Sequence, residues 1–181
     1  MHPVSKLAAC LLLIAASAAA QDSPGRKAPS VTLTRVPLTS ITRGKPGTVE
    51  LQFKISPGFH INSNTPKSEF LIPTALKLNA PTDIVVGKVT YPDGVDRSFP
   101  FAPDEKINVY SGTFELAVVV RPLGTVVPGK YALHGQLKYQ ACDNAACYPP
   151  KKLPVDFEVK VEKAKSVVHK KNPGQSPHAH N

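Results

Sequence analysis

Hydrophobic and polar residues alternate along much of the chain, with the two-residue period that is typical of half-buried β-strands. The segment from Val155 to Glu162 is the clearest case, because Val and Phe alternate there with Asp, Glu and Lys. No segment shows the period of a long helix. The pattern predicts strands at Val31–Arg35, Thr48–Ile55, Phe59–Asn62, Ala75–Leu78, Ile84–Tyr91, Gly112–Arg121, Tyr131–Tyr139 and Val155–Glu162.

Pro and Gly residues lie close together between several of these strands. Pro restricts φ, whereas Gly tolerates positive φ, so their combination favours a tight turn. Such turns are predicted at Arg43–Gly47, Ser56–Gly58, Pro92–Gly94 and Val127–Gly129. Short strands separated by turns at this spacing predict an all-β fold, an antiparallel β-sandwich of immunoglobulin-like type.

The first 20 residues depart from the alternating pattern. Lys6 precedes an apolar run from Leu7 to Ala16, and small residues fill positions 17–20 ahead of Gln21. This is the pattern of a cleaved secretory signal peptide, so we expect an exported protein that is soluble after cleavage in an oxidising compartment. Cys10 ends a sequence similar to a lipoprotein cleavage box, but too little of the apolar run precedes it to favour a lipid anchor.

The rest of the chain is long enough for one domain. We expect a flexible lead-in at residues 21–30, one domain at 31–162, and a disordered, basic, His-containing tail at 163–181. No further apolar run approaches the roughly 20 residues that span a bilayer. The net charge is +9, but the basic residues are scattered and no basic-aromatic motif accompanies them. We therefore expect no binding to nucleic acid. We also expect the protein to be a monomer.

The segment from Tyr139 to Pro150 holds Cys142 and Cys147, the two cysteines beyond the predicted leader. Their spacing keeps the sulfurs close together in both oxidation states, which favours a pair that cycles between dithiol and disulfide. The alternative is a structural staple. A closed loop of about six residues stabilises a fold by only about 2 kcal/mol, less than a bridge between distant strands.

Four further residues are candidates for a role beside the cysteines. Tyr139 and Tyr148 bracket the pair and could shield the sulfurs, although tyrosines at strand ends often serve only packing. His60 and Asn62 are two residues apart and share one face of a predicted strand. His60 could assist proton transfer if that face lies against the cysteines, and the alternative is a solvated strand face.

No cofactor or metal site is expected. The sequence lacks a phosphate-binding glycine loop, a Gly-x-Ser-x-Gly elbow, a His-Glu-x-x-His motif and a haem attachment motif. Methionine occurs only at position 1, which excludes a Met-lined copper site after cleavage, and two cysteines do not supply the four ligands of a structural zinc. His178 and His180 in the tail could bind a transition metal weakly.

Three stretches of the sequence resemble the family of the amino-terminal periplasmic domain of the thiol:disulfide interchange protein DsbD. The most specific is Tyr139-Gln-Ala-Cys142 followed by Cys147-Tyr-Pro-Pro150. Supporting matches are Gly58–Asn64 with Phe70–Thr74, and Tyr91–Gly94 with Val109–Gly112. The resemblance covers residues 31 to 162.

This resemblance implies an immunoglobulin-like sandwich with a redox-active cysteine pair in the periplasm. Its partners would be thioredoxin-like periplasmic proteins or a membrane thiol reductase. Cys147 would form the mixed disulfide with a partner and Cys142 would resolve it. The sequence contains neither the membrane domain nor the thioredoxin-like domain of full-length DsbD, so we expect a separate protein to supply the electrons.

The resemblance also implies an aromatic cap over the cysteine pair, in the region from Phe99 to Tyr110. Phe101 is the expected cap and Phe99 the alternative. Both rings lie between prolines in the segment Ser98–Pro103, which shows no strand period. They would otherwise belong to the hydrophobic core.

The sequence thus predicts a thiol–disulfide interchange module, an oxidoreductase component rather than a self-sufficient enzyme, because a thioredoxin-type Cys-x-x-Cys at a helix start is absent. The first alternative is a non-catalytic immunoglobulin-like binding module with one structural disulfide. The second is a metal-binding accessory protein.

Overall fold

The computed structural model describes residues 29–164. The predicted leader, Cys10 and the tail histidines His169, His178 and His180 lie outside this range. All regular structure between residues 29 and 164 is strand, so this part of the chain has no helix that could cross a membrane. The strands are β1 (Val31–Arg35), β2 (Thr39–Thr42), β3 (Gly47–Ile55), β4 (His60–Asn62), β5 (Ala75–Asn79), β6 (Ile84–Thr90), β7 (Val95–Phe99), β8 (Ala102–Ser111), β9 (Thr113–Pro122), β10 (Gly129–Tyr139), β11 (Ala141–Cys142) and β12 (Lys151–Glu162).

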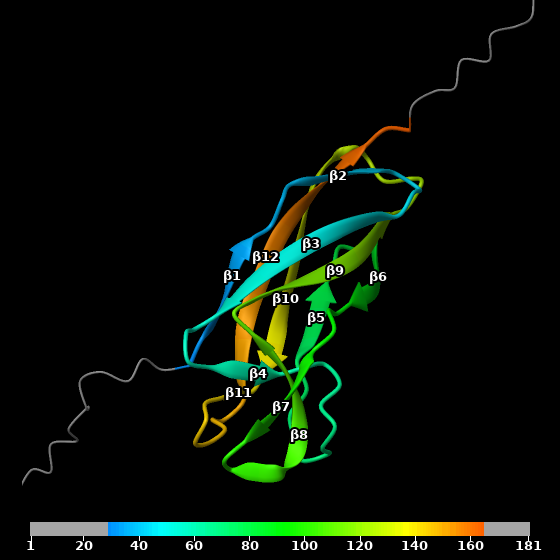
Figure 1. Cartoon of the computed structure of the whole chain (residues 1–181). Coiled ribbons are helices and arrows are strands. Elements are labelled where there is room, and N and C mark those ends of the chain that lie inside the picture. Colours follow the sequence, from blue (N-terminus) through cyan, green and yellow to red (C-terminus); the bar gives the residue numbers. More distant parts are fainter. Residues whose placement is uncertain (1–28, 165–181) are drawn as a thin grey trace, which may run out of the picture.

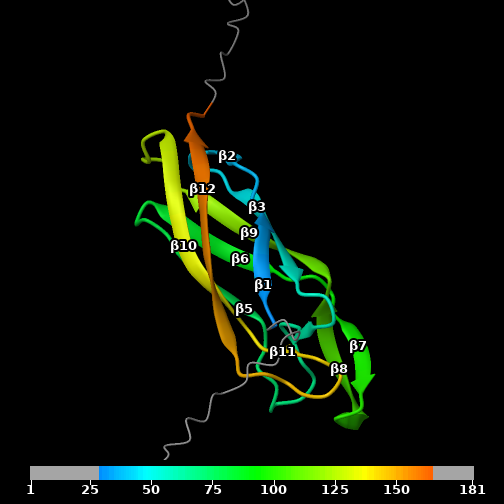
Figure 2. The same cartoon turned by 90° about the vertical axis from the view of Figure 1, so that its left-hand side faces the viewer.

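Two four-stranded sheets form the body of the molecule, with strand orders β1-β3-β9-β6 and β2-β12-β10-β5. They lie face to face, as the two views in Figure 1 and Figure 2 show. Alternation along the strands supplies the core between them. In β3, Val49, Leu51 and Phe53 are fully buried, whereas Glu50 and Lys54 face solvent. The immunoglobulin-like β-sandwich predicted from the sequence is confirmed.

The sandwich is not purely antiparallel. The chain passes from one sheet to the other between β1 and β2, across residues 36–38. Strand β2, which the sequence pattern did not predict, then pairs in parallel with the end of β12, from Thr39 opposite Val159 to Thr42 opposite Glu162. This pairing covers the edge of β12, because β10 occupies its other side.

A third sheet, with strand order β11-β4-β8-β7, lies at one end of the sandwich. It is at the lower end of the molecule in Figure 1. Of its four strands, only β4 was predicted. Strand β7 exposes every residue except its last, Phe99, and β8 exposes residues 103–106, so neither shows a continuous alternation of buried and exposed positions.

The prediction that Ser98–Pro103 carries no strand is therefore wrong. Phe99 ends β7 and pairs with Ala102, the first residue of β8. Pro100 and Phe101 form the two-residue turn between them. Pro suits a turn at the tip of a hairpin, because its missing N–H removes no ladder hydrogen bond there.

The third sheet has a small hydrophobic cluster of its own, separate from the main core. Phe99, Ile107 and Val109 are buried in it, and three partly buried residues pack against them: Leu71, Phe101 and Ala102. The main core holds apolar residues of the two large sheets, together with Ile61 from β4, Tyr110 from β8 and Ala141 from β11. The molecule thus has one large core and a satellite core beneath the third sheet.

Candidate functional site

Cys142 and Cys147 form a disulfide within a short hairpin at the edge of the third sheet. The two residues face each other as an isolated antiparallel bridge, with their Cα atoms 3.9 Å apart. Backbone hydrogen bonds flank the pair on both sides. The Tyr148 N–H donates to the Ala141 carbonyl at 2.8 Å, and the Asp143 N–H donates to the Ala146 carbonyl at 3.0 Å.

The side chain of Asp143 organises the tip of this hairpin. Its Oδ1 accepts hydrogen bonds from the N–H groups of Ala145 and Ala146, at 2.8 and 3.0 Å. Its Oδ2 accepts one from the Tyr148 hydroxyl at 2.8 Å. Asp143 was not among the site residues predicted from the sequence. Its position directly after Cys142 could have predicted this role, because Asp and Asn favour turns by accepting hydrogen bonds from backbone N–H groups two or three residues further on.

The two sulfur-bearing residues differ in accessibility. Cys142 is fully buried, with 0% of its surface exposed, whereas Cys147 is only partly buried. A partner that approaches from solvent therefore reaches Cys147 first. Two adjoining hollows, of about 300 and 490 Å³, lie beside the hairpin and share Gly58, Phe59 and Asn144 in their walls.

Gln140 connects the cysteine hairpin to the rest of the third sheet. Its Oε1 accepts hydrogen bonds from the Asn62 side-chain amide at 3.1 Å and from the Ile72 N–H at 3.2 Å. Its Nε2 donates to the Tyr148 carbonyl at 3.3 Å. Gln140 was part of the recognised motif, but its role as a connector between three segments was not predicted.

His60 lies directly beside Cys142. The two residues are paired across β4 and β11, and His60 pairs on its other side with Ser111 of β8. Only 5% of His60 is exposed, so the interpretation of a solvated strand face is wrong. Burial lowers the pKa of the imidazole to about 4, helped by the positive charge of Arg97 and opposed by the negative charge of Asp143. The ring is therefore neutral at pH 7.

Asn62 is also buried, with 0% of its surface exposed. Its Nδ2 donates to the Ile72 carbonyl at 3.0 Å in addition to Gln140, so it fastens the loop between β4 and β5 to the third sheet. His60 and Asn62 therefore lie on one buried face of β4. His60 is next to a cysteine, whereas Asn62 contacts the connecting residue Gln140.

A row of three stacked rings leads away from His60. The imidazole stacks on Phe99 with ring centroids 4.1 Å apart, and Phe99 stacks on Phe101 at 5.4 Å. Phe99 is 5% exposed and Phe101 is partly buried. The ring closest to the cysteine pair in this row is thus His60, and Phe99 covers it.

The other candidate aromatic residues lie in two different places. Tyr148 belongs to the site, because it bonds to Asp143 and packs edge-on against Phe59 with centroids 5.8 Å apart. Tyr139 and Tyr110 are members of the main core, each 4% exposed. The Tyr139 hydroxyl accepts a hydrogen bond from the Val31 N–H, which fits the packing alternative.

Tyr110 is fixed by the loop after β4. Its hydroxyl donates to Asn64 Oδ1 at 2.6 Å, and its ring stacks on Phe114. Burial raises the pKa of this hydroxyl. Tyr110 therefore supports the loop rather than the cysteine pair.

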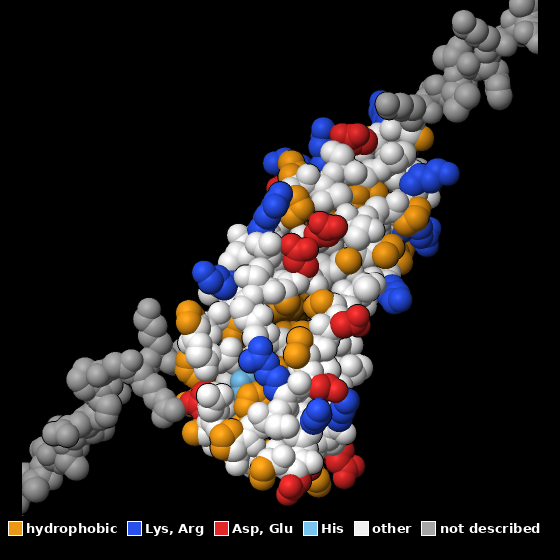
Figure 3. Space-filling model, in the orientation of Figure 1, with side chains coloured by type: hydrophobic (Ala, Val, Ile, Leu, Met, Phe, Trp, Pro, Cys, Tyr) orange, Lys and Arg blue, Asp and Glu red, His pale blue; other side chains and the backbone are white. Residues whose placement is uncertain are grey.

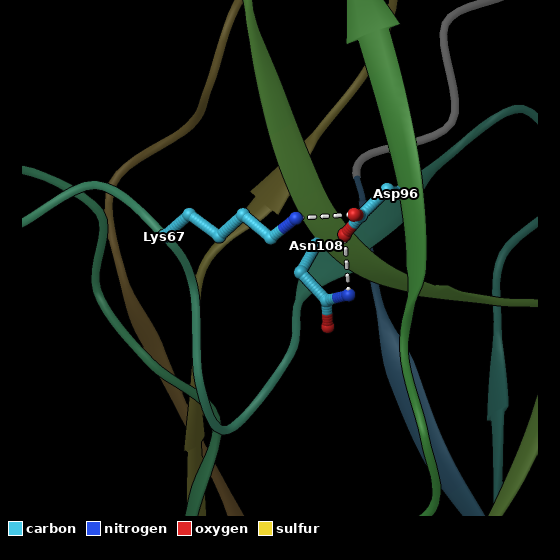
Figure 4. Close-up of polar contacts among 3 residues, drawn as sticks. All are labelled: Lys67, Asp96 and Asn108. Atoms are coloured by element: carbon cyan, nitrogen blue, oxygen red, sulfur yellow. Dashed lines mark hydrogen bonds and ion pairs between the residues drawn. The ribbon is translucent and has the colours of Figure 1, made fainter.

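An ion pair fastens the β7–β8 hairpin, which carries Phe99 and Phe101, to the loop between β4 and β5, and a hydrogen bond within the hairpin supports it. Figure 4 shows Lys67 of that loop directed toward the Asp96 carboxylate of β7, with which it forms an ion pair. The side-chain amide of Asn108, in β8, donates to the same carboxylate at 2.7 Å. These two contacts lower the pKa of Asp96, with the hydrogen bond from Asn108 as the larger cause.

Charged side chains of both signs are mixed on the face of the molecule drawn in Figure 3. Figure 3 shows Lys and Arg side chains spread over one face of the molecule and interspersed with Asp and Glu. Between residues 29 and 164, no group of three His, Cys, Asp or Glu side chains is placed to hold a metal ion.

A partly exposed disulfide, held in an edge hairpin of an immunoglobulin-like sandwich, defines a domain equipped for thiol–disulfide exchange. The family model described as the N-terminal part of the thiol:disulfide interchange protein DsbD matches residues 32–158. The chain belongs to this family. No curated protein matches the chain.

Solved structures that the chain matches include two that contain the DsbD N-terminal domain of Neisseria meningitidis. One is the reduced form; it is 24% identical, covers 60% of this chain and 74% of that chain, and has a TM-score of 0.39. The other is a complex with the PilB N-terminal domain, with 24% identity, 60% and 73% coverage and a TM-score of 0.39. A cohesin from Pseudobacteroides cellulosolvens is 14% identical, with 76% and 96% coverage and a TM-score of 0.43.

Proposed function

We propose that the chain is a periplasmic thiol–disulfide interchange module that relays reducing equivalents through Cys142 and Cys147. The observation that carries the proposal is the asymmetry of the pair, with one buried and one partly exposed cysteine in a hairpin at a sheet edge. Membership of the DsbD N-terminal family supports it. The partners are thioredoxin-like periplasmic proteins or a membrane thiol reductase.

The exchange begins at the accessible sulfur. A thiolate of a reduced partner attacks Sγ of Cys147, the Cys142–Cys147 bond breaks, and Cys142 leaves as a thiolate that takes up a proton. The partner's second thiolate then attacks the partner sulfur of the mixed disulfide. The partner leaves as a disulfide, two electrons remain on this chain, and both cysteines are thiols.

The reduced pair passes its electrons on by the reverse steps. The Cys147 thiolate attacks the disulfide of an acceptor protein, and one acceptor sulfur leaves as a thiol. Cys142 then attacks Sγ of Cys147, which restores the disulfide and releases the second acceptor thiol. Cys142 is suited to this resolving role because burial keeps it away from any sulfur except that of Cys147.

The aromatic residues beside the pair complete the proposed site. Phe101 and Phe99 act as a cap that limits access of small thiols, with Phe99 packed on His60 and Phe101 on Phe99. Tyr148 holds the outer strand of the hairpin through Asp143. A docking partner would displace the cap and cover Cys147 in its place.

Trapping of the mixed disulfide tests the assignment of the two sulfurs. Cys142→Ala and Cys147→Ala proteins are activated with Ellman's reagent and mixed with a thioredoxin-like domain that lacks its own resolving cysteine. We expect rapid release of thionitrobenzoate and a covalent complex, cleaved by dithiothreitol, for Cys142→Ala. We expect slow or absent reaction for Cys147→Ala, because its remaining sulfur is buried.

Equal trapping by the two variants would remove the assignment of roles. If neither folded variant forms a complex, and the wild-type disulfide is reduced only on unfolding, the pair is a structural staple and the proposal is wrong.

A further inference from the structure

His60 carries a buried nitrogen without a hydrogen bond. In the part of the chain between residues 29 and 164, the buried side-chain atoms without a partner are His60 Nε2 and Asn62 Oδ1. Buried polar atoms are nearly always hydrogen-bonded, because a buried atom without a partner loses its hydrogen bonds to water and gains none from the protein. Nε2 of His60 therefore lacks a hydrogen-bond partner in the disulfide form of the protein.

None of its neighbours in the structure forms a hydrogen bond with Nε2, although the positive charge of Arg97 lies close enough to act on the imidazole. The face of the imidazole is covered by the Phe99 ring, which has no donor. The carboxylate of Asp143 is a further neighbouring charge, but its two oxygens already accept bonds from Ala145, Ala146 and Tyr148. In the tautomer with the proton on Nδ1, Nε2 is an acceptor, so it pairs with a donor and not with a carboxylate.

Cys142 is the residue that changes its capacity to donate. It is opposite His60 across β4 and β11, so the two side chains lie on one face of the sheet with Cβ atoms about 5 Å apart. Both residues are buried. In the disulfide, neither sulfur carries a proton, whereas in the dithiol the Cys142 S–H is a donor.

We propose that Nε2 of His60 accepts a hydrogen bond from the Cys142 thiol when the pair is reduced, and that His60 thereby shifts the equilibrium of the pair toward the dithiol. Reduction breaks the Sγ–Sγ bond, adds two electrons and two protons, and leaves one proton on each sulfur. The electrons come from a reduced dithiol, which becomes a disulfide. The inference deepens the proposed function, since it concerns the same pair of cysteines.

The equilibrium between the protein and dithiothreitol measures this effect directly. Wild type and His60→Phe are equilibrated at pH 7 over a range of ratios of reduced to oxidised dithiothreitol, and free thiols are counted after alkylation. Loss of one hydrogen bond from a thiol donor corresponds to about a two- to tenfold change in the equilibrium constant. We expect the His60→Phe disulfide to be harder to reduce by about that factor, because only its dithiol form loses a contact.

Two matched variants accompany this measurement. His60→Gln keeps an acceptor at about the position of Nε2, and we expect its equilibrium constant to lie closer to wild type than that of His60→Phe. His134→Phe removes an exposed histidine, which pairs with Asp156 on β12, and should leave the constant unchanged. A shift in His134→Phe as large as that in His60→Phe, or no shift in His60→Phe, would overturn the proposal.

A spectroscopic measurement on the wild-type protein does not depend on whether a variant folds. The ¹⁵N chemical shift of His60 Nε2 is recorded by NMR for the oxidised and the dithiothreitol-reduced protein. We expect it to move on reduction in the direction of a hydrogen-bonded acceptor, whereas the nitrogens of His134 stay in place. An identical His60 shift in the two states would refute the inference.

Failure of this inference is distinguishable from failure of the proposed function. Dithiothreitol reports the effect of His60 even if no protein partner exchanges with the pair. Conversely, mixed disulfides trapped through Cys147 would support the exchange function even if His60 had no effect on the equilibrium.

Discussion

His60 combines two properties that are unusual for a histidine, since it is uncharged well below neutral pH and it is buried next to a disulfide. The pKa of about 4 results mainly from burial, with Arg97 of β7 adding to the effect and Asp143 of the hairpin opposing it. In the unfolded chain the same ring would titrate near its ordinary value of 6.5. Protonation therefore favours unfolding.

The expected consequence is a loss of stability on acidification. The unfolded chain binds a proton at His60 as the pH falls below 6.5, while the folded chain resists protonation until about pH 4. Between these values the free energy of unfolding should fall by about 3 kcal/mol from this residue alone. Urea unfolding at pH 7 and pH 4 should therefore show a larger loss for wild type than for His60→Phe, and equal losses would contradict the prediction.

For individual residues, the sequence predicted the redox chemistry of Cys142 and Cys147 better than it predicted which side chains surround them. The four residues between Cys142 and Cys147 are enough to keep the sulfurs adjacent, and the motif around them identified the family. The burial of His60 was not predictable from alternation, because its cover, Phe99, is 39 positions further along the chain and joins it only through the pairing of β4, β8 and β7.

At the scale of elements, the β7–β8 hairpin determines how the site is covered. Its tip holds Phe101 and its first strand ends at Phe99. Asp96 bonds to Asn108 within the hairpin and pairs with Lys67 of the loop between β4 and β5. The two strands of this hairpin were not predicted from the sequence, because many of their side chains face solvent. Its pairing is maintained by backbone hydrogen bonds and a few apolar contacts, which leave little trace in a hydrophobic pattern.

Truncation of the two hairpin phenylalanines should have different effects. Phe99 is buried, so Phe99→Ala should cost about 3 kcal/mol in stability, whereas the partly buried Phe101 should cost less. We expect Phe101→Ala to leave the fold intact and, if the proposed cap restricts access to the site, to speed reduction of the disulfide by dithiothreitol. Stopped-flow reduction and urea unfolding measure the two effects.

Phe70→Ala is the matched control for this experiment, because 84% of Phe70 is exposed on the loop between β4 and β5. Phe70→Ala should change neither the rate at which dithiothreitol reduces the disulfide nor the free energy of unfolding. A reduction rate of Phe101→Ala equal to that of wild type, or a loss of stability as large as that of Phe99→Ala, would defeat the cap hypothesis.

At the scale of the whole molecule, the cysteine hairpin is separate from most of the structure that keeps the chain folded. The large core lies between the two four-stranded sheets, and the site lies at their end, where Ala141 joins the large core and Phe99, which stacks on His60, belongs to the satellite core. The large sheets were well predicted, since strands such as β3 and β12 have one face in the core and one in solvent. In the third sheet only β4 was predicted from the sequence. The other strands were not, because β11 has two residues and β7 is exposed at every position except Phe99.

The fold should therefore survive loss of the disulfide. Loop entropy for a ring of about six residues gives a loss of about 2 kcal/mol for the double variant Cys142→Ala/Cys147→Ala. We expect an unchanged circular dichroism spectrum and a cooperative unfolding transition at lower urea concentration. For comparison, Leu51→Ala in the main core should cost about 2–5 kcal/mol. An unfolded double variant would show that the disulfide is needed for the fold.

The hydrogen bonds that close the cysteine hairpin join backbone atoms and the Asp143 carboxylate, so none of them requires the sulfur–sulfur bond. The two cysteines consequently stay neighbours after one of them has joined a partner. Resolution by Cys142 is then an intramolecular step, for which effective molarities reach about 10⁵–10⁸ M in well-oriented systems. The lifetime of each mixed disulfide would be set within this hairpin and would not depend on how much free thiol surrounds the protein.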